Sequence, residues 1–321
     1  MEELERLFRI SPSKPPLDAI IVSVDLETSG SKGKTLQVNR KEVSGVREIG
    51  FAILDTRVLF PPLPRQKAFK GSMNESLEES NPHMISTHQF STSHASEDLE
   101  DCDNTDFEEC VFSRTRYIIQ DNLNDTIARY IQFPEDTTAR CTKDTTGLRA
   151  VVIVGHSPER DLEIIRRLGV SINRIAPVAA IIDTYRLSRY ILGPDSPLGK
   201  SAPLQKFALW NVLTELGVPY NWYDLHNAGN DATYTLYTLI MLAARWTEYK
   251  GGAVAAAGLR AFVEGEAAAP RWKPVRNSLG AHRVEEEVRN PVVRLGSGLV
   301  AVAKSLRLSS SEAKKVVKSD Q

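Results

Sequence analysis

The chain has 321 residues, of which 41% are hydrophobic and 25% are charged, and its formal net charge is −1 at pH 7. This length suits one large domain or two small ones. A net charge near zero excludes a strong overall attraction to nucleic acid or membranes, so any such attraction must come from local patches. The three cysteines form no Cys-x-x-Cys pair, and the first residues lack the apolar run of a signal peptide or membrane span. These features predict an intracellular protein, cytoplasmic or nuclear, without membrane association.

The first part of the chain predicts two neighbouring strands followed by an insertion. Residues 19–26 (AIIVSVDL) form a nearly continuous apolar run, which is typical of a strand buried on both faces. Residues 48–56 (EIGFAILDT) predict a second, antiparallel strand after a Gly-rich and Lys-rich loop. Residues 71–110 contain eleven acidic residues and no Lys or Arg, which predicts a solvated, partly disordered insertion. Within it, residues 84–92 (MISTHQFST) are a candidate strand.

The second part predicts helices and strands in alternation. The expected helices cover residues 117–133, 158–169, 184–191, 203–217 and 230–247, and the expected strands cover residues 150–157 and 178–184. Strands first, then strands and helices in alternation, indicate a mixed α/β sheet flanked by helices.

We divide the chain into an N-terminal arm at 1–17, a main domain at 18–247 and a tail at 248–321. The tail begins with an Ala/Gly-rich stretch, and from residue 251 onward it has twelve Lys or Arg against seven Asp or Glu. This composition predicts a flexible basic segment.

Two carboxylates share one face at the end of the first predicted strand. Asp25 and Glu27 are two residues apart, so both side chains project to the same side. Like charges at this separation repel, and partial burial adds to the cost, unless a cation lies between them or one is protonated. The alternative is that the pair marks the exit of the strand into solvent.

Two further segments each place a carboxylate at the start of a helix. Asp161 heads the apolar face formed by Ile164, Ile165 and Leu168, and Asp231 follows a candidate cap, Asn230, with Gly229 freeing the backbone before it. An acidic residue in a first turn also stabilises a helix without any ligand. His226 lies just upstream of Asp231, where an isolated loop histidine is usually a solvated surface residue.

Taken together, these residues predict metal-dependent phosphodiester chemistry. Ligand sites of open α/β sheets form at strand ends and helix starts, which is where all three segments place their carboxylates. Ligands that are all oxygen suit Mg²⁺ or Mn²⁺, and two such ions can hold the attacking and leaving oxygens of a phosphodiester. Histidine can accept a proton from the attacking water near neutral pH.

With these residues in place, the sequence resembles the DnaQ-like (DEDDh) 3′→5′ exonucleases of the RNase H-like fold. The first motif, D-x-E, matches Asp25 and Glu27 in VSVDLETSG; the second matches Asp161 in GHSPERD; the third, H-x-x-x-x-D, matches His226 and Asp231 in HNAGND. The resemblance covers about residues 18–247. In wording, LHNAGNDA and GHSPERD look closest to a fungal branch related to proteins linked to mRNA transport.

The resemblance implies an RNase H-like mixed five-stranded sheet and a 3′→5′ exonuclease acting on single-stranded RNA or DNA. By resemblance, the four acids would hold two Mg²⁺ or Mn²⁺ ions and His226 would be the general base. The acidic insertion is longer than the usual hairpin connection and could repel a nucleic-acid backbone. Five aromatic residues near the motifs are candidates for stacking on bases, although aromatic residues there more often belong to the core: Tyr185, Trp210, Tyr220, Trp222 and Tyr223.

Two alternatives come from other functional classes. A catalytically silent nucleic-acid-binding or scaffold protein could keep the same fold and use the insertion and the tail for protein partners. The presence of all four acids and the histidine argues against it. A nucleotide-binding α/β protein without metal chemistry lacks the Gly-rich fingerprint it would need. We interpret His83, His88 and His94 as solvated loop residues, because no zinc-ligand pattern joins them.

Overall fold

The computed structural model describes residues 1–28, 35–38, 41–60, 84–93, 110–135, 147–199 and 204–269. The strands are β1 Ile20–Thr28, β2 Thr35–Val38, β3 Lys41–Ser44, β4 Val46–Asp55, β5 Ser86–Ser93, β6 Thr115–Ile119, β7 Val151–Gly155 and β8 Val178–Asp183. The α-helices are α1 Glu2–Leu7, α2 Thr56–Leu59, α3 Leu123–Arg129, α4 Glu159–Arg167, α5 Ile172–Ile175, α6 Thr184–Leu192, α7 Leu209–Leu216, α8 Ala228–Tyr249 and α9 Ala253–Ala268. Two short 3-10 helices are η3 Gln120–Asn122 and η4 Trp222–Asp224.

A mixed sheet with the strand order β6-β5-β4-β1-β7-β8 forms the centre of the molecule. β4 is antiparallel to both β1 and β5, as predicted for β1 and β4, whereas β7 runs parallel to β1 and β8 runs parallel to β7. The sheet has six strands, one more than the five that were expected. The α/β class is confirmed.

The additional strand comes from a segment that we predicted to be helical. Residues 117–133 were expected to form one helix, but β6 and η3 precede the short helix α3. Tyr117, Ile118 and Ile119 are aromatic and β-branched, and β6 pairs in parallel with β5. A short apolar run fits both periodicities, and here the open edge of β5 decides for a strand. The candidate strand within the insertion is confirmed as β5; most of residues 71–110 lie outside the described residues.

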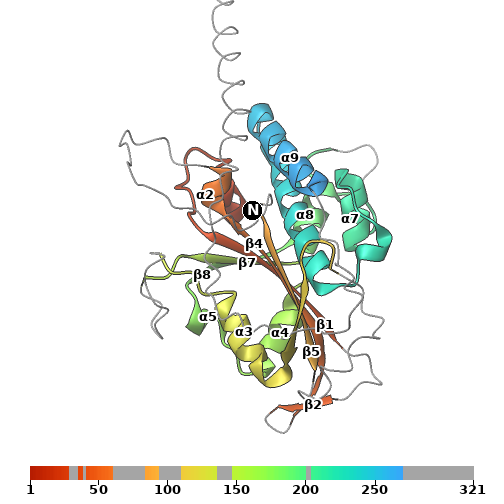
Figure 1. Ribbon diagram of the computed structural model, residues 1–321. Helices are drawn as coiled ribbons and strands as arrows, with labels where there is room; N and C mark the ends of the chain where they lie inside the picture. Colours follow the sequence, from red (N-terminus) through yellow and green to blue (C-terminus); the bar gives the residue numbers. More distant parts are fainter. Residues whose placement is uncertain are drawn as a thin grey trace, which may run out of the picture.

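Helices cover both faces of the sheet (Figure 1). α8 lies against β4, β1 and β5, and α6, α7 and α9 pack around it. The opposite face is covered by α3 and α4, whose buried side chains include Ile127 and Ile165. Because both faces are covered, the central strand β1 carries the continuous apolar run that the sequence shows.

Two segments that we expected outside the main domain pack against it. In residues 1–17, α1 buries Leu4 and Leu7 in the same core cluster as α8. The Ala-rich start of residues 248–321 was expected to be flexible, but it forms α9, because alanine has the highest helix propensity and α8 supplies a surface for it. The Glu266 carboxylate on α9 accepts hydrogen bonds from the backbone N–H groups of Met84 (2.8 Å) and Ile85 (3.2 Å), just before β5.

The histidine of β5 also differs from its prediction. His88 was expected to be a solvated loop residue, but its ring packs 4.6 Å from that of Tyr130, between centroids. Burial, with a smaller contribution from the charge of Arg116, lowers the pKa of His88 to about 3. A neutral, packed imidazole suits this position, whereas His83 and His94 lie outside the described residues.

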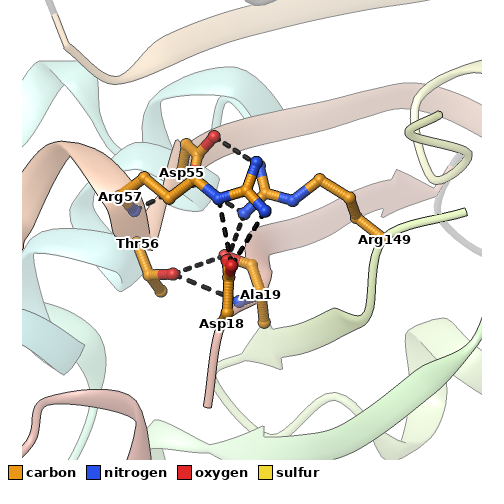
Figure 2. Close-up of polar contacts among 6 residues, drawn as sticks. All are labelled: Asp18, Ala19, Asp55, Thr56, Arg57 and Arg149. Carbon is orange, nitrogen blue, oxygen red and sulfur yellow. Dashed lines mark hydrogen bonds and ion pairs between the residues drawn. The ribbon is translucent and has the colours of Figure 1, made fainter. Parts of the chain in front are cut away.

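An ion cluster joins the starts of β1 and β7 to the end of β4 (Figure 2). The buried Arg149 guanidinium contacts both carboxylate oxygens of Asp55, and it donates to the Asp18 carboxylate at 2.6 Å. Arg57 reaches the same Asp18 carboxylate at 2.8 Å from the solvent side. Although burial opposes the charged form, hydrogen bonds and charge from Asp55 and Asp18 raise the pKa of Arg149. The cluster thus fixes three strands at one end of the sheet.

We expect Arg149→Met to lower the free energy of unfolding by about 3–5 kcal/mol, because it leaves the buried Asp55 carboxylate without its cation. Urea unfolding followed by circular dichroism measures this change. Arg57→Met is the matched control, since Arg57 is 41% exposed and its exposed ion pair with Asp18 should contribute at most about 1 kcal/mol. Equal effects of the two substitutions would contradict the prediction.

Candidate active site

The first two predicted acids lie at the end of β1 that is opposite the Arg149 cluster. Asp25 and Glu27 are both half-buried, and in the antiparallel register they pair with Gly50 and Glu48 of β4. The two side chains therefore project from the same face of β1, as predicted. The end of β1 emerges from the core here, so the two carboxylates can reach a ligand while their backbone stays in the sheet.

The third acid is placed by the turn between β7 and α4. Ser157 in this turn has the left-handed backbone angle φ +66°, and its N–H donates to the Asp183 carboxylate at 3.0 Å. Asp183 also caps the start of α6 through Tyr185 N–H at 2.9 Å. Asp161 follows in the first turn of α4 and is half-buried, ahead of the buried Ile164 as predicted.

The histidine and the fourth acid lie where α8 begins. His226 is exposed, adopts φ +67°, and donates its backbone N–H to the Asp231 carboxylate at 3.0 Å. We expected Asn230 to be the cap, but Asn227 caps the helix, and its side-chain oxygen accepts from Asn230 N–H at 3.1 Å. Residues 227–230 are therefore the cap and first turn of α8. A left-handed histidine is uncommon and indicates that surrounding contacts impose this conformation.

The structure brings Glu27 at the end of β1 next to His226 and Asp231 at the start of α8, and Asp25 and Asp161 are close enough for the carboxylate charges to act on one another. A carboxylate oxygen of Glu27, a ring nitrogen of His226 and a carboxylate oxygen of Asp231 lie within 4.8 Å of one another. Burial, and then the charges of Asp231 and Asp161, raise the pKa of Asp25 well above its usual value. Burial also raises the pKa of Asp161 to about 7, with the nearby charges of Arg160 lowering it and Glu27 raising it.

This donor set fits a divalent cation. Half-buried carboxylates whose charges raise the pKa of a neighbouring carboxylate favour either proton uptake or a bound cation. A cation at this position would remove the repulsion that the sequence pattern predicted.

A buried polar network behind the site was not predicted. Glu48 of β4 is 2% exposed, and its carboxylate accepts from Gln89 Nε2 at 2.8 Å and from Ala228 N–H at 3.3 Å, at the start of α8. Gln89 in turn accepts from Gly229 N–H. Glu48 and Gln89 are therefore positioning residues for the segment that carries His226 and Asp231. The signal in the sequence was an acidic side chain next to the apolar run of β4.

Gly50 explains how close α8 comes to the sheet. A Cβ atom at this position would lie 2.0 Å from the Ala228 carbonyl oxygen, so only glycine allows the contact. Gly229, which we had interpreted as freeing the backbone, instead lies inside the first turn of α8. A Cβ there would meet the Gln89 side chain at 2.7 Å. Both glycines serve close packing.

None of the helices in the described part of the chain is long and apolar enough to cross a membrane.

Comparison with protein families places the site in a known class. Residues 20–242 match the family described as DEDDh, DNA polymerase III subunit epsilon-like, C-terminal domain. A comparison with curated proteins finds no match. The matched range includes β1, α4 and the start of α8, which carry the four carboxylates, and the loop before α8, which carries the histidine. The mixed sheet with flanking helices agrees with the RNase H-like fold, and the family supports an exonuclease-type function. The chain therefore belongs to the DEDDh family of DNA polymerase III subunit epsilon-like domains.

Proposed function

We propose that the protein is a divalent-metal-dependent 3′→5′ exonuclease that hydrolyses phosphodiester bonds of single-stranded RNA or DNA. The observation that carries this proposal is the cluster of Glu27, His226 and Asp231, whose neighbours Asp25 and Asp161 lie within reach of the same carboxylate charges. The 3′→5′ direction and the preference for single strands are taken from the resemblance to the family. The relation to the fungal branch is likewise a proposal, based on the wording of the motifs.

Each side chain has a role in the proposed reaction. Asp25, Glu27, Asp161 and Asp231 would hold two Mg²⁺ or Mn²⁺ ions, and bound ions would supply activation of the attacking water and stabilisation of charge on the phosphodiester oxygens. His226 is exposed and its ring nitrogen lies near Glu27 and Asp231, so it can reach a water molecule held there and accept its proton. The hydrogen bond from His226 N–H to Asp231 keeps the base and the carboxylate in fixed relation.

The direct test uses purified protein with 5′-labelled single-stranded RNA and DNA in Mg²⁺, Mn²⁺ or EDTA. We expect a ladder that shortens from the 3′ end with either ion and no cleavage in EDTA. Asp25→Ala should remove the ladder. Products that shorten from the 5′ end would refute the direction, and strand binding without any cleavage would support the catalytically silent alternative.

The thermal effect of metal should increase with pH. An aspartate in an unfolded chain has a pKa of about 3.9, whereas the folded protein raises the pKa of Asp161 to about 7. Between these values the folded state holds a proton that the unfolded state has released, so the metal-free protein loses stability as the pH rises. A divalent ion binds the deprotonated carboxylates and offsets this loss.

We therefore expect Mg²⁺ or Mn²⁺ to raise the melting temperature clearly at pH 8 and little at pH 5, as measured by differential scanning fluorimetry. Asp161→Asn is the matched variant, because it removes the group that titrates while keeping its shape. It should reduce the difference between the two pH values. The same metal-induced shift at pH 5 and pH 8 in the unsubstituted protein would contradict the prediction.

A further inference from the structure

Three aromatic side chains are exposed on α7 and η4, the two elements that precede His226 in the chain. Trp210 on α7 is 38% exposed, and Trp222 and Tyr223 on η4 are 51% and 81% exposed. We call these three residues the aromatic surface. Large aromatic side chains usually bury most of their surface area. Aromatic residues near the motifs were expected to belong to the core in most cases, and the exposure of these three side chains shows that they do not.

The other two aromatic candidates are part of the packed structure. The Tyr185 ring lies edge-on to the His156 and Phe207 rings, with centroids 5.8 Å and 6.0 Å away. The Tyr220 ring lies edge-on to the ring of the buried Tyr234, with centroids 6.4 Å apart. The structure thus divides the five sequence candidates into two packed residues and three exposed ones.

η4 is anchored at its last residue, while its aromatic residues remain in solvent. The buried Asp224 accepts from Asn230 Nδ2 at 2.8 Å through its carbonyl, and from the Tyr234 hydroxyl at 3.3 Å through its carboxylate. Both partners belong to α8. Tyr223 is three residues before His226, so their Cα atoms lie at most about 11 Å apart. A short stretch of single-stranded nucleic acid can span this distance between Tyr223 and His226.

Trp210 connects the aromatic surface to the second motif. The His156 Nε2 atom donates to the Phe207 carbonyl at 2.7 Å, which ties the segment before α7 to the end of β7. Trp210 follows three residues later and contacts Trp222 edge to face, with centroids 5.3 Å apart and an interplanar angle of 74°. In an edge-to-face contact, the ring that contributes its edge keeps both of its faces uncovered by the other ring. The segment before α7 is thus tied to the end of β7, and η4 comes just before His226 in the chain.

We propose that the aromatic surface stacks the unpaired bases of the strand whose phosphodiester bond lies at the carboxylates. This inference rests on the proposed function and names the part of the substrate that these residues bind. Every base offers a π-face, so aromatic rings hold a strand without reading its sequence. Charge also favours a nucleic acid over an apolar protein segment, because Arg160, next to Asp161 on α4, and Lys206, four residues before Trp210, are both exposed and can contact phosphates.

The test compares a strand with a substrate that has no neighbouring base to stack. We would measure kcat and KM for a single-stranded oligonucleotide and for the p-nitrophenyl ester of thymidine 5′-monophosphate, using Trp222→Ala and Tyr223→Ala. Trp222→Phe and Tyr223→Phe retain a ring. Tyr249→Ala is the matched control, because Tyr249 is 49% exposed at the far end of α8, about 30 Å from its start.

We expect each alanine variant to raise KM for the oligonucleotide about tenfold, with both phenylalanine variants and Tyr249→Ala close to the unsubstituted protein. Turnover of the small ester should not change. An unchanged KM for the oligonucleotide would overturn the inference, and so would equal losses on both substrates, which would mean that η4 only positions His226.

Binding separates this inference from the proposed function. If the unsubstituted protein cleaves neither substrate, the proposed function fails, and fluorescence anisotropy with the labelled oligonucleotide in EDTA still tests the aromatic surface. Weaker binding by Trp222→Ala and Tyr223→Ala would support it. Equal binding by these variants, or no binding by the unsubstituted protein, would overturn it and leave a protein partner as the occupant of this surface.

Discussion

Asp231→Asn is expected to reduce metal-dependent cleavage on the order of 10³-fold or more, because an amide cannot replace the charge of a carboxylate ligand. The variant should keep its fold, since asparagine retains an oxygen that can accept from His226 N–H, as Asp231 does. Single-turnover cleavage of the labelled strand measures the loss. Asp195→Asn, in an exposed loop outside the site, is the control and should retain full activity.

Stability distinguishes a ligand from a structural residue at position 231. The charge of Asp231 raises the pKa of Asp25, so the two carboxylates repel each other in the metal-free protein. In EDTA, the Asp231→Asn variant should therefore melt at the same temperature as the unsubstituted protein or at a higher one. In Mn²⁺, the variant should melt at a lower temperature than the unsubstituted protein. Full activity in this variant would exclude Asp231 as a metal ligand.

His226→Asn is expected to lower the cleavage rate by roughly 10²–10⁴-fold while leaving metal binding intact, since the ring would act on the water and not hold the ions. Asparagine tolerates the left-handed backbone of this position better than most residues, so the hydrogen bond from residue 226 to Asp231 should persist. His226→Ala, as the second variant, tests whether the loss depends on the substitute.

The measurement pairs the cleavage rate with the metal-induced shift in melting temperature. A slow variant whose shift equals that of the unsubstituted protein assigns His226 to proton transfer. A slow variant whose shift is lost would make His226 a ligand or a support for Asp231 instead. Unchanged turnover would exclude His226 as the general base.

The sequence predicted the local features of the site well because each depends on neighbouring residues. Periodicity and helix-start signals within a few residues predict the apolar run of β1, the paired acids at its end and the start of α4. The placement of Asp161 at the head of the apolar face of its helix needed no information from elsewhere in the chain.

The features that were not predicted depend on contacts distant in sequence. β6 is a strand because β5 offers an edge for pairing, and α9 is ordered because α8 supplies a surface. Glu48 supports the start of α8 from about 180 residues earlier in the chain, a distance no local pattern spans. The cap of α8 was predicted to be Asn230, but the hydrogen bond that the Asn227 side chain accepts from Asn230 N–H makes Asn227 the cap.

The positions of Asp161 and Asp231 in the first turns of α4 and α8 also bear on the charge balance of the loaded site. In the proposed state, four carboxylates and two divalent ions cancel. Each helix start adds a partial positive charge of about +0.5, because its peptide dipoles align. Together the two helices leave the neutralised site with roughly one positive charge, which matches the single negative charge of a phosphodiester.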